Sequence, residues 1–454
     1  MQKSSLFKLA RPASALLLVL SACSDAPADP TDPPPDDTQP APVDMQPAPD
    51  GPQAVPITPP TTPGASVDCA LAGGHCPAIA IAGEAPQPSL FHGYADPSLR
   101  KDPNAGTIYM AYSWANELLD PGTKQTTMNV ELHLAHSADQ GATWTKDGAL
   151  FTSHGVTNPG GGNYAAQNQS SDEVIDLLPI DLGTSTMWIQ AHQDYLVPLG
   201  GHSIYAQIDA TSAISVSAII APAGAPPSTL LGLRTAPEAR LAPGTTDPTL
   251  NPTTNLSALD GDHCTNFNQP ALWYQGGKLY LVVQCFENPA SGDGKATAHF
   301  VYATTPLGAD ATKWQWHAVG TFATPADAAH LGQAEGTPYQ LLTEMQLVTG
   351  TTGQLLAILN PGILTPNGVQ PVTQYGCRAI PVTSLDPPAL AMTAGAPTVV
   401  AKATESDLYG SPNEGTGACS YDAASTTGIV LVRKLEADPQ QGFFVSLQAT
   451  KLMP

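Results

Sequence analysis

Short runs of alternating apolar and polar residues recur along this chain from about residue 85 onward. Each run follows a turn that holds Gly, Asn or Thr and is rich in β-branched and aromatic residues, which is typical of β-strands. Five copies of this turn and strand, spaced by roughly 75 to 95 residues, occupy 104–112, 183–190, 276–283, 351–358 and 425–432. A fixed long period indicates an internal repeat.

The repeats favour an all-β fold. Helical periodicity is scarce, and Gly and Pro occur throughout. Many short strands with a long period predict a β-propeller over residues 85–454, with five blades of four antiparallel strands. The longest spacing contains residues 221–262, interpreted as an inserted loop, with a hidden sixth blade as the alternative. The early strand 77–82 either pairs with the last blade and closes the ring or remains an unpaired leader.

Residues 137–144, Ser-Ala-Asp-Gln-Gly-Ala-Thr-Trp, follow an alternating run and predict two antiparallel strands joined by a tight turn. Gly141 suits a positive φ, and Ser137 and Asp139 can bond backbone amides across the turn. The octet resembles the Asp box of sialidases and related β-propellers. That resemblance implies a structural hairpin at the outer side of a blade, away from any active site. Residues 304–308 with Trp314 resemble a degenerate copy at the corresponding place in a later repeat.

The N-terminal residues carry a secretory signal. Basic residues precede an apolar run too short to span a bilayer, and residues 20–23 (Leu-Ser-Ala-Cys) resemble a bacterial lipobox. The signal peptide is expected at 1–22, with Cys23 lipidated; an ordinary signal peptide with an incidental Cys is the alternative. Ser24 favours the outer membrane, either periplasmic or surface-exposed. The Pro- and Asp-rich segment 23–64 is expected to be a disordered linker.

Six cysteines remain after Cys23, an even set in an oxidising compartment. Fifteen pairings are possible in principle. We expect Cys69 to pair with Cys76 and Cys264 with Cys285, because both pairs close short loops. We expect Cys377 to pair with Cys419, because this pair would link neighbouring repeats. The first pair defines a disulfide-containing leader, residues 65–84. A zinc site is the rival interpretation, but no CxxC pair supports it.

The net charge and the absence of certain motifs exclude several classes of binding partner. The net charge is -22, from 17 Lys plus Arg against 39 Asp plus Glu. Such a surface repels nucleic acid and anionic lipid headgroups, so the expected contact with a membrane is the lipid anchor alone. There is no serine nucleophile elbow, phosphate-binding loop or dinucleotide fingerprint, and no cofactor or metal is expected. The expected partner is an extracellular glycan or protein ligand, and the chain is expected to be a monomer.

Propellers place ligands where the innermost strands begin. Aligning the repeats puts Asp96, Gln269 and Glu344 at this place in the first, third and fourth copies. The second copy offers Asp172, Glu173 or Asp176, depending on a gap that the alignment leaves open, and the fifth offers residues 418–421. Converging carboxylates are what glycosidic bond cleavage needs, one as proton donor and one as base or nucleophile.

Residues 94–98, Tyr-Ala-Asp-Pro-Ser, resemble the Asp-Pro motif of five-bladed arabinanase- and xylosidase-type glycosidases. The resemblance implies that Asp96 is the general base and Glu344 the general acid. Gln269 departs from it, because the third blade of that group carries a second Asp that tunes the acid. A neutral amide cannot tune by charge, which puts inverting hydrolysis in doubt. Gln269, Asp172 and Glu173 are the expected substrate-binding residues.

A true sialidase is disfavoured. Sialidases clamp a substrate carboxylate with three arginines, and Ala95 stands where the first should be. Isolated histidines and tryptophans on strands, such as His92, His192, His202 and Trp188, are expected to pack rather than bind. The sequence thus predicts a cell-surface lipoprotein whose propeller binds or hydrolyses extracellular glycans. The alternative is a non-catalytic propeller that serves as an interaction or adhesion platform.

Overall fold

The computed structural model describes residues 65–69, 76–84, 91–119, 126–152, 154–156, 168–198, 213–243, 254–256, 264, 266–286, 296–364, 372–404, 418–436 and 443–454. The chain divides into two compact units, Met1–Gln46 and Pro47–Pro454, and every described residue belongs to the second. The predicted signal peptide, Cys23, the linker 23–64 and His202 lie outside the described residues. No helix in the described ranges has the length and apolar character to cross a membrane.

Antiparallel strands form five consecutive groups. The first contains β3 (Phe91–Lys101), β4 (Ile108–Leu119), β5 (Thr126–Ser137) and β6 (Trp144–Phe151). The second contains β8 (Asn168–Asp181), β9 (Ser185–Pro198), β10 (Ala213–Pro222) and β11 (Glu238–Pro243). The third contains β13 (Asn266–Gln275), β14 (Lys278–Phe286), β15 (Ala296–Thr304) and β16 (His317–Ala323).

The fourth group contains β17 (Leu341–Thr349), β18 (Leu355–Leu364), β20 (Cys377–Leu385) and β24 (Ala401–Thr404). The fifth contains β25 (Cys419–Ser420), β26 (Val430–Glu436) and β27 (Phe443–Ala449). Short additional strands are β7 (His154–Val156), β12 (Thr254–Leu256), β19 (Val372–Gln374), β21 (Pro388–Leu390), β22 (Met392–Thr393) and β23 (Ala396–Pro397).

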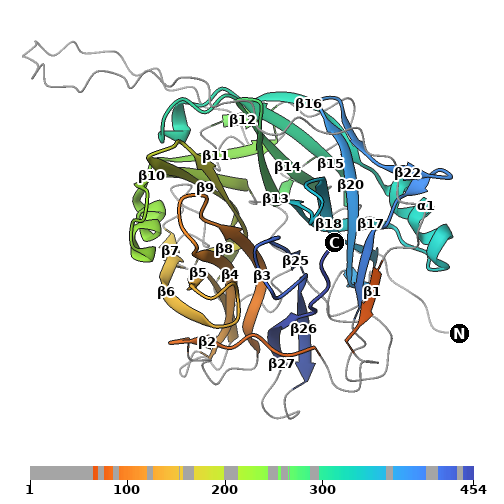
Figure 1. Cartoon of the computed structure of the whole chain (residues 1–454), viewed down its shortest axis with the longest axis horizontal. Helices are drawn as coiled ribbons and strands as arrows, with labels where there is room; N and C mark the ends of the chain where they lie inside the picture. Colours follow the sequence, from red (N-terminus) through yellow and green to blue (C-terminus); the bar gives the residue numbers. More distant parts are fainter. Residues whose placement is uncertain are drawn as a thin grey trace, which may run out of the picture. The chain divides into compact units, whose positions relative to one another are not determined.

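The first strands of the five groups close a ring. Contacts join β3 to β8, β8 to β13, β13 to β17, β17 to β25, and β25 back to β3 (Figure 1). Sheets placed around a common axis by their first strands define a β-propeller, as the sequence predicts. All five repeated strands are the second strands of their groups, at β4, β9, β14, β18 and β26. The number of blades remains a prediction, which the five groups match.

The hydrophobic core lies between neighbouring sheets. Leu177 and Trp188 of the second group pack with Tyr109 and Leu134 of the first. Trp188 is fully buried, and its ring meets Tyr109 edge to face, with centroids 5.0 Å apart. An aromatic pair in this geometry stabilises the interface beyond the area it buries. Trp188 therefore packs sheet against sheet, as expected.

The leader runs along the outer edges of three groups. Strand β1 (Ala65–Asp68) pairs in parallel with β24 of the fourth group. Ala78 then forms an antiparallel bridge with Gln448 of the fifth group. Strand β2 (Ile81–Ala82) pairs in parallel with β6 of the first group. The sequence left open whether residues 77–82 pair with the last group or stay unpaired, and the bridge from Ala78 to Gln448 confirms the pairing. The leader also covers strand edges that would otherwise expose unpaired amides.

All three predicted disulfides form: Cys69–Cys76, Cys264–Cys285 and Cys377–Cys419. The first lies in the leader, between the segment that pairs with β24 and the segment that meets β27. The third joins β20 of the fourth group to β25 of the fifth, so it links neighbouring repeats as expected. A cross-link of this kind restricts the unfolded chain.

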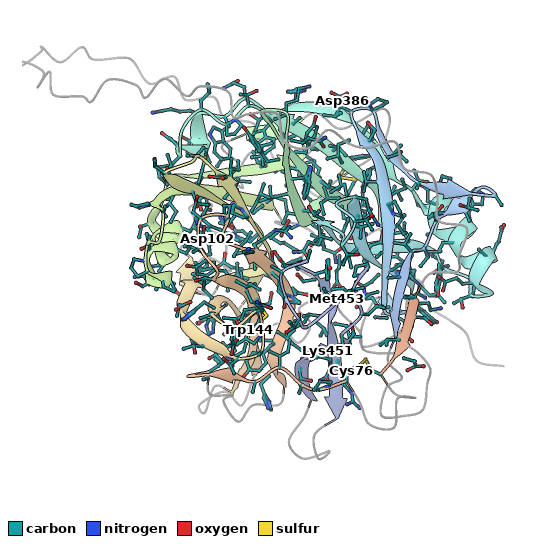
Figure 2. The ribbon with its side chains drawn as sticks, in the orientation of Figure 1. Cys76, Asp102, Trp144, Asp386, Lys451 and Met453 are labelled. Atoms are coloured by element: carbon teal, nitrogen blue, oxygen red, sulfur yellow. A yellow bond between two sulfur atoms is a disulfide. The ribbon has the colours of Figure 1, made fainter. Side chains whose placement is uncertain are left out.

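The predicted hairpin connects β5 and β6. Asp139 Oδ1 accepts the Thr143 amide at 2.9 Å, and Ser137 Oγ accepts the Gly141 amide at 2.8 Å. Trp144, labelled in Figure 2, is buried and donates its indole N–H to the Gly141 carbonyl at 3.1 Å. The degenerate copy lies at the matching place between β15 and β16, where Trp314 donates to the Gly308 carbonyl at 3.2 Å. Both motifs act as structural turns.

Two segments differ from expectation. Residues 221–262, interpreted as an inserted loop, contain the 3₁₀ helix η2 (Pro227–Thr235), the fourth strand β11, and β12 as an extra edge strand. Another short 3₁₀ helix, η5 (Ala311–Lys313), precedes β16. Between β16 and β17 lies an α-helix, α1 (Pro325–Glu335), which begins with a capping box between Thr324 and Asp327. Its Thr-Pro-x-Asp start is a local signal for a helix that strand periodicity does not reveal.

Candidate active site

Four of the first strands carry the same local distortion. The β-ladder shifts register after Ala95, Glu173, Asn268 and Thr343, which marks a β-bulge in each strand. One residue in each bulge has a positive φ: Asp96 (48°), Val174 (51°), Gln269 (50°) and Glu344 (52°). Non-glycine residues rarely adopt this conformation, and a β-bulge can re-aim a side chain. The repeats therefore place one residue each at equivalent strained positions.

These bulges surround a central cavity of about 20 Å³. All five groups line it: Asp96 and Pro97, residues 174–176, Pro270, residues 344–346, and residues 418–419. A volume of this size is room for about one water molecule. Three acidic residues line this small space: Asp96, Glu344 and Asp176, of which Asp176 is paired with Arg100.

Asp96 lies in β3 and is 6% exposed. Burial raises its pKa to about 6, and a hydrogen bond from Ser113 opposes that rise. Ser113 Oγ also accepts the Val174 amide at 3.0 Å, so it fixes the bulge of the next strand as well. A carboxyl group with a pKa near 6 is ionised at neutral pH and can act as a base.

Glu344 lies in β17, and its Oε2 is buried without a hydrogen-bond partner among the described residues. Burial, then the charge of Asp96 and that of Glu173, raise its pKa well above the usual value, while a hydrogen bond from Gln374 opposes them. Because the charge of Asp96 is one cause of the high pKa of Glu344, ionised Asp96 favours the protonated form of Glu344. Two carboxyl groups whose surroundings separate their pKa values are a typical acid and base pair.

The three expected substrate-binding residues fall into different places. Glu173 precedes the bulge in β8, and its charge acts on Glu344. Gln269 occupies the bulge of β13, and its Oε1 accepts the Glu344 amide at 2.6 Å. Asp172 is buried beside His192, with 3.1 Å between Asp172 Oδ1 and His192 Nε2, and does not line the cavity. The structure brings Glu173 and Gln269 close to Glu344, whereas Asp172 contacts His192.

A ring of hydrogen bonds lies two residues beyond the bulges. A side chain of one group accepts a backbone amide of the next: Ser98 from Leu177 (3.0 Å), Asp176 from Leu272 (2.7 Å), Gln346 from Tyr421 (3.3 Å) and Ser420 from Leu99 (2.8 Å). Each of these side chains is buried. The bonds run in one direction around the axis and lock neighbouring first strands in register.

An ion pair fills the centre of this ring. Arg100 Nη2 lies 2.9 Å from Asp176 Oδ1 and also donates to the Leu347 carbonyl at 3.0 Å. Gln346 Nε2 donates to Asp176 Oδ1 at 3.1 Å and to Ser98 Oγ at 3.0 Å. Arg100, Asp176 and Gln346 come from three different groups. Paired and hydrogen-bonded charges of this kind are tolerated in a dry interior.

The sequence alignment missed Val174 as the bulge residue of the second repeat. Leu177 offers the signal, because it aligns with Leu99, Leu272 and Leu347, and all four side chains are fully buried. Counting back three residues from each leucine gives Asp96, Val174, Gln269 and Glu344. Asp176, which the open gap had allowed at this place, belongs instead to the buried ring. The supporting side chains Ser113 and Gln374 come from second and later strands and had no recurring pattern to reveal them.

Other chemistries find little support in the described residues. Three of the five described arginines are occupied elsewhere: Arg100 pairs with Asp176, Arg378 with Glu335 at 2.7 Å, and Arg240 with Asp194 at 3.0 Å. Such arginines cannot form the clamp of a sialidase. Within the described ranges, no group of three or more His, Cys, Asp or Glu side chains is placed to hold a metal ion.

No protein-family model matches the chain, and neither does any curated protein. Solved structures of glycoside hydrolases are similar at low identity. A family 117 glycoside hydrolase from the marine bacterium Zobellia galactanivorans is 12% identical, covers 83% of this chain and 90% of its own, and has a TM-score of 0.40. An α-L-arabinofuranosidase from Lactobacillus brevis is 12% identical, covers 81% of this chain and 94% of its own, and has a TM-score of 0.43. A glycosyl hydrolase from Bacteroides ovatus is 10% identical, covers 83% of this chain and 92% of its own, and has a TM-score of 0.39.

Proposed function

We propose that this protein hydrolyses glycosidic bonds in extracellular glycans, with Glu344 as the general acid and Asp96 as the general base. The observation that supports this most is the pair itself. Two carboxyl groups occupy equivalent bulges and line one central cavity. Burial raises the pKa of both, and the charge of Asp96 is a further cause of the raised pKa of Glu344. Glycosidases need one protonated and one ionised carboxyl group at neutral pH.

In the proposed reaction, a water molecule attacks the anomeric carbon while Asp96 accepts one of its protons. Glu344 donates its proton to the glycosidic oxygen, and the bond between that oxygen and the anomeric carbon breaks. One water is consumed and two sugar fragments leave. Glu344 ends ionised and Asp96 ends protonated, so exchange of one proton with solvent restores the starting state.

The proposed location is the outer membrane, through a lipid on Cys23. The lipobox-like residues 20–23 and the Pro-rich segment after them support this proposal. A Pro-rich chain rises about 3.1 Å per residue, so a linker of this length reaches on the order of 100 Å. Such a tether would let the propeller meet polymers that cannot approach the membrane.

The test is hydrolysis of a panel of nitrophenyl glycosides and polysaccharides by the full chain and by Asp96→Asn and Glu344→Gln. Each variant replaces a titratable carboxyl group with a neutral amide of similar shape. Removing a general acid or base typically costs about 10²- to 10⁴-fold in rate. Turnover that falls this far in both variants supports the proposal, and turnover that both variants retain contradicts it.

Glycan or protein binding without turnover is the second candidate. The observation that favours it is the small volume of the central cavity, about 20 Å³. A binding platform does not need a deep pocket. Absence of turnover on every member of the panel, with retained binding to one of the polysaccharides, would favour this function over hydrolysis.

A further inference from the structure

Glu344 is held from outside its own sheet. Its backbone amide donates to Gln269 Oε1 at 2.6 Å, and Gln269 belongs to β13 of the preceding group. Both residues have a positive φ, at 52° for Glu344 and 50° for Gln269. A glutamate in this conformation is strained, so it persists only where its surroundings hold it. The hydrogen bond to Gln269 is such a restraint, applied at the residue whose carboxyl group enters the cavity.

The junction between the third and fourth groups is built differently from the others. At the other four junctions a side chain two residues beyond the bulge position accepts an amide of the next strand, as Ser98 and Ser420 do. At this junction the corresponding residue is Ala271, which has no acceptor atom in its side chain. Gln269 supplies the inter-strand bond instead, three residues earlier along the next strand, at Glu344 itself.

The amide group of Gln269 suits this contact. Only its carbonyl oxygen can accept a backbone N–H, so the side chain binds in one orientation. A carboxylate at this position would also accept the bond, but it would add a negative charge beside Glu344. Gln269 therefore restrains the backbone without contributing charge.

We propose that Gln269 is a positioning residue, which holds the Glu344 backbone in the bulged conformation that directs its carboxyl group into the central site. The proposal rests on the proposed glycosidase function for its catalytic consequence. It gives Gln269 a role other than binding substrate, and it explains how a neutral residue can serve the acid without tuning it by charge.

Two substitutions separate the effect of the hydrogen-bond acceptor from the effect of charge at position 269. Gln269→Met keeps the length of the side chain but removes the acceptor, and Gln269→Glu keeps an acceptor and adds charge. A misplacement of about 1 Å can cost on the order of 100-fold in rate. We therefore expect kcat of Gln269→Met to fall about 10- to 100-fold with KM nearly unchanged. Gln269→Glu retains kcat within about threefold, and its alkaline limb moves to higher pH because the added charge favours protonated Glu344.

Ser137→Ala is the matched control. It removes the acceptor of the Gly141 amide in the hairpin between β5 and β6, and neither residue lines the cavity. It should lower thermal stability while leaving kcat and the pH profile unchanged. A loss of activity in Ser137→Ala as large as in Gln269→Met would show a general effect of lowered stability and would overturn the proposal.

Amide hydrogen exchange tests the contact independently of turnover. In Gln269→Met the Glu344 amide should exchange at least tenfold faster while the Gly141 amide is unaffected, and Ser137→Ala should show the reverse. If no glycoside is hydrolysed, the proposed function fails, and exchange alone decides whether Gln269 restrains Glu344. Unchanged exchange at Glu344 in Gln269→Met, or unchanged kcat in an active enzyme, would overturn the proposal.

Discussion

The bulge residues show how a repeated fold can hold different chemistry at equivalent places. Asp96, Val174, Gln269 and Glu344 share one backbone conformation, and only two of them are acids. Val174 is a notable member, because a β-branched residue at positive φ is strained. The backbone is therefore maintained by the fold, through contacts such as the Val174 amide with Ser113 Oγ, and the side chain is free to differ.

Glu173 provides a test of the electrostatics at this scale. Its charge is one of the causes that raise the pKa of Glu344. We expect Glu173→Gln to lower the pKa of Glu344, because the neutral amide no longer opposes ionisation of the acid. The measurement is a carbon NMR titration of the Glu344 carboxyl group in both proteins. A titration midpoint that stays the same or rises would show that Glu173 does not act on Glu344.

The candidate site could be read from the sequence only in part. Asp96 and Glu344 follow from aligning the repeats by their second strands. Asp172 was expected beside Glu173, but neighbouring residues on a strand point to opposite faces, and it contacts His192 instead. The contact between Gln269 and Glu344 joins residues 75 positions apart, and no local pattern specifies it.

At the scale of single elements, the hairpin between β5 and β6 is stabilised by hydrogen bonds within its turn and by a hydrogen bond with the fifth group. The Gln140 carbonyl accepts the Thr426 amide at 2.8 Å, so this hairpin is tied to the loop before β26. Gly141 has a φ of 85°, and a Cβ there would overlap Ser425 Oγ. The glycine is therefore required both by the turn and by the contact.

Gly141→Ala is expected to destabilise the protein by about 1–3 kcal/mol, from backbone strain together with the displaced Ser425 side chain. Gly183→Ala is the matched control, because Gly183 has the same φ of 85° and open space around its Cβ position. The free energy of unfolding is measured in denaturant for both variants. Equal losses would show that the contact with Ser425 contributes nothing.

The leader ends in a buried polar cluster. Glu84 accepts hydrogen bonds from Tyr112 (2.6 Å) and Lys146 (2.8 Å) and lies 2.6 Å from His133 Nδ1. The other ring nitrogen of His133 faces Glu131 at 3.2 Å. Burial raises the pKa of Glu84, but these partners outweigh it and hold the pKa below 4.5. Burial likewise lowers the pKa of His133, and the two carboxylates outweigh it and raise the pKa above 6.5.

The cluster predicts a stability maximum at mildly acidic pH. The contribution of Glu84 is present above its unfolded pKa of 4.5 and is lost as pH falls through its lower folded value. That of His133 is complete below 6.5 and is lost as pH rises through its higher folded value. Both are therefore complete between 4.5 and 6.5. Glu84→Gln should flatten both sides of a plot of melting temperature against pH, and an unchanged plot would contradict this role.

At the scale of the whole described unit, the ring of hydrogen bonds and the Arg100–Asp176 pair tie the five groups at their centre. Residues far apart in the sequence meet there, including Ser98 and Gln346, whose side chains are 3.0 Å apart. The leader and the Cys377–Cys419 disulfide add connections away from the axis. The propeller is thus held both at its centre and along its edges.

Asp176→Asn is expected to lower the free energy of unfolding by about 3–5 kcal/mol, because it leaves the buried Arg100 without its counter-charge. Replacing both partners, as in Arg100→Met with Asp176→Leu, should recover most of that loss. Denaturant unfolding of the wild type and these variants measures both effects. A double variant as unstable as Asp176→Asn would show that the loss does not come from the unpaired charge.

Much of the fold follows from the sequence for a physical reason. Each repeat carries its own turn glycines and strand alternation, so the five second strands and the hairpin at 137–144 are locally encoded. The parallel pairing of β1 with β24 is not locally encoded, because most of the chain lies between these two strands. The same holds for β2 and β6, which are separated in the sequence by the first three strands of the first group. Helix α1 is not among the predicted elements, because it is too short to show a long helical periodicity; its capping box at Thr324 and Asp327 is the local signal for it.

The pH dependence of kcat/KM on the best substrate tests the assignment of acid and base most directly. Asp96 must be ionised, so activity should rise as pH passes about 6, the pKa of Asp96. Glu344 must be protonated, so activity should fall as pH passes its raised pKa. The prediction is a bell-shaped profile with an acidic limb near pH 6. Activity that is independent of pH across both limbs would contradict the roles of Asp96 and Glu344.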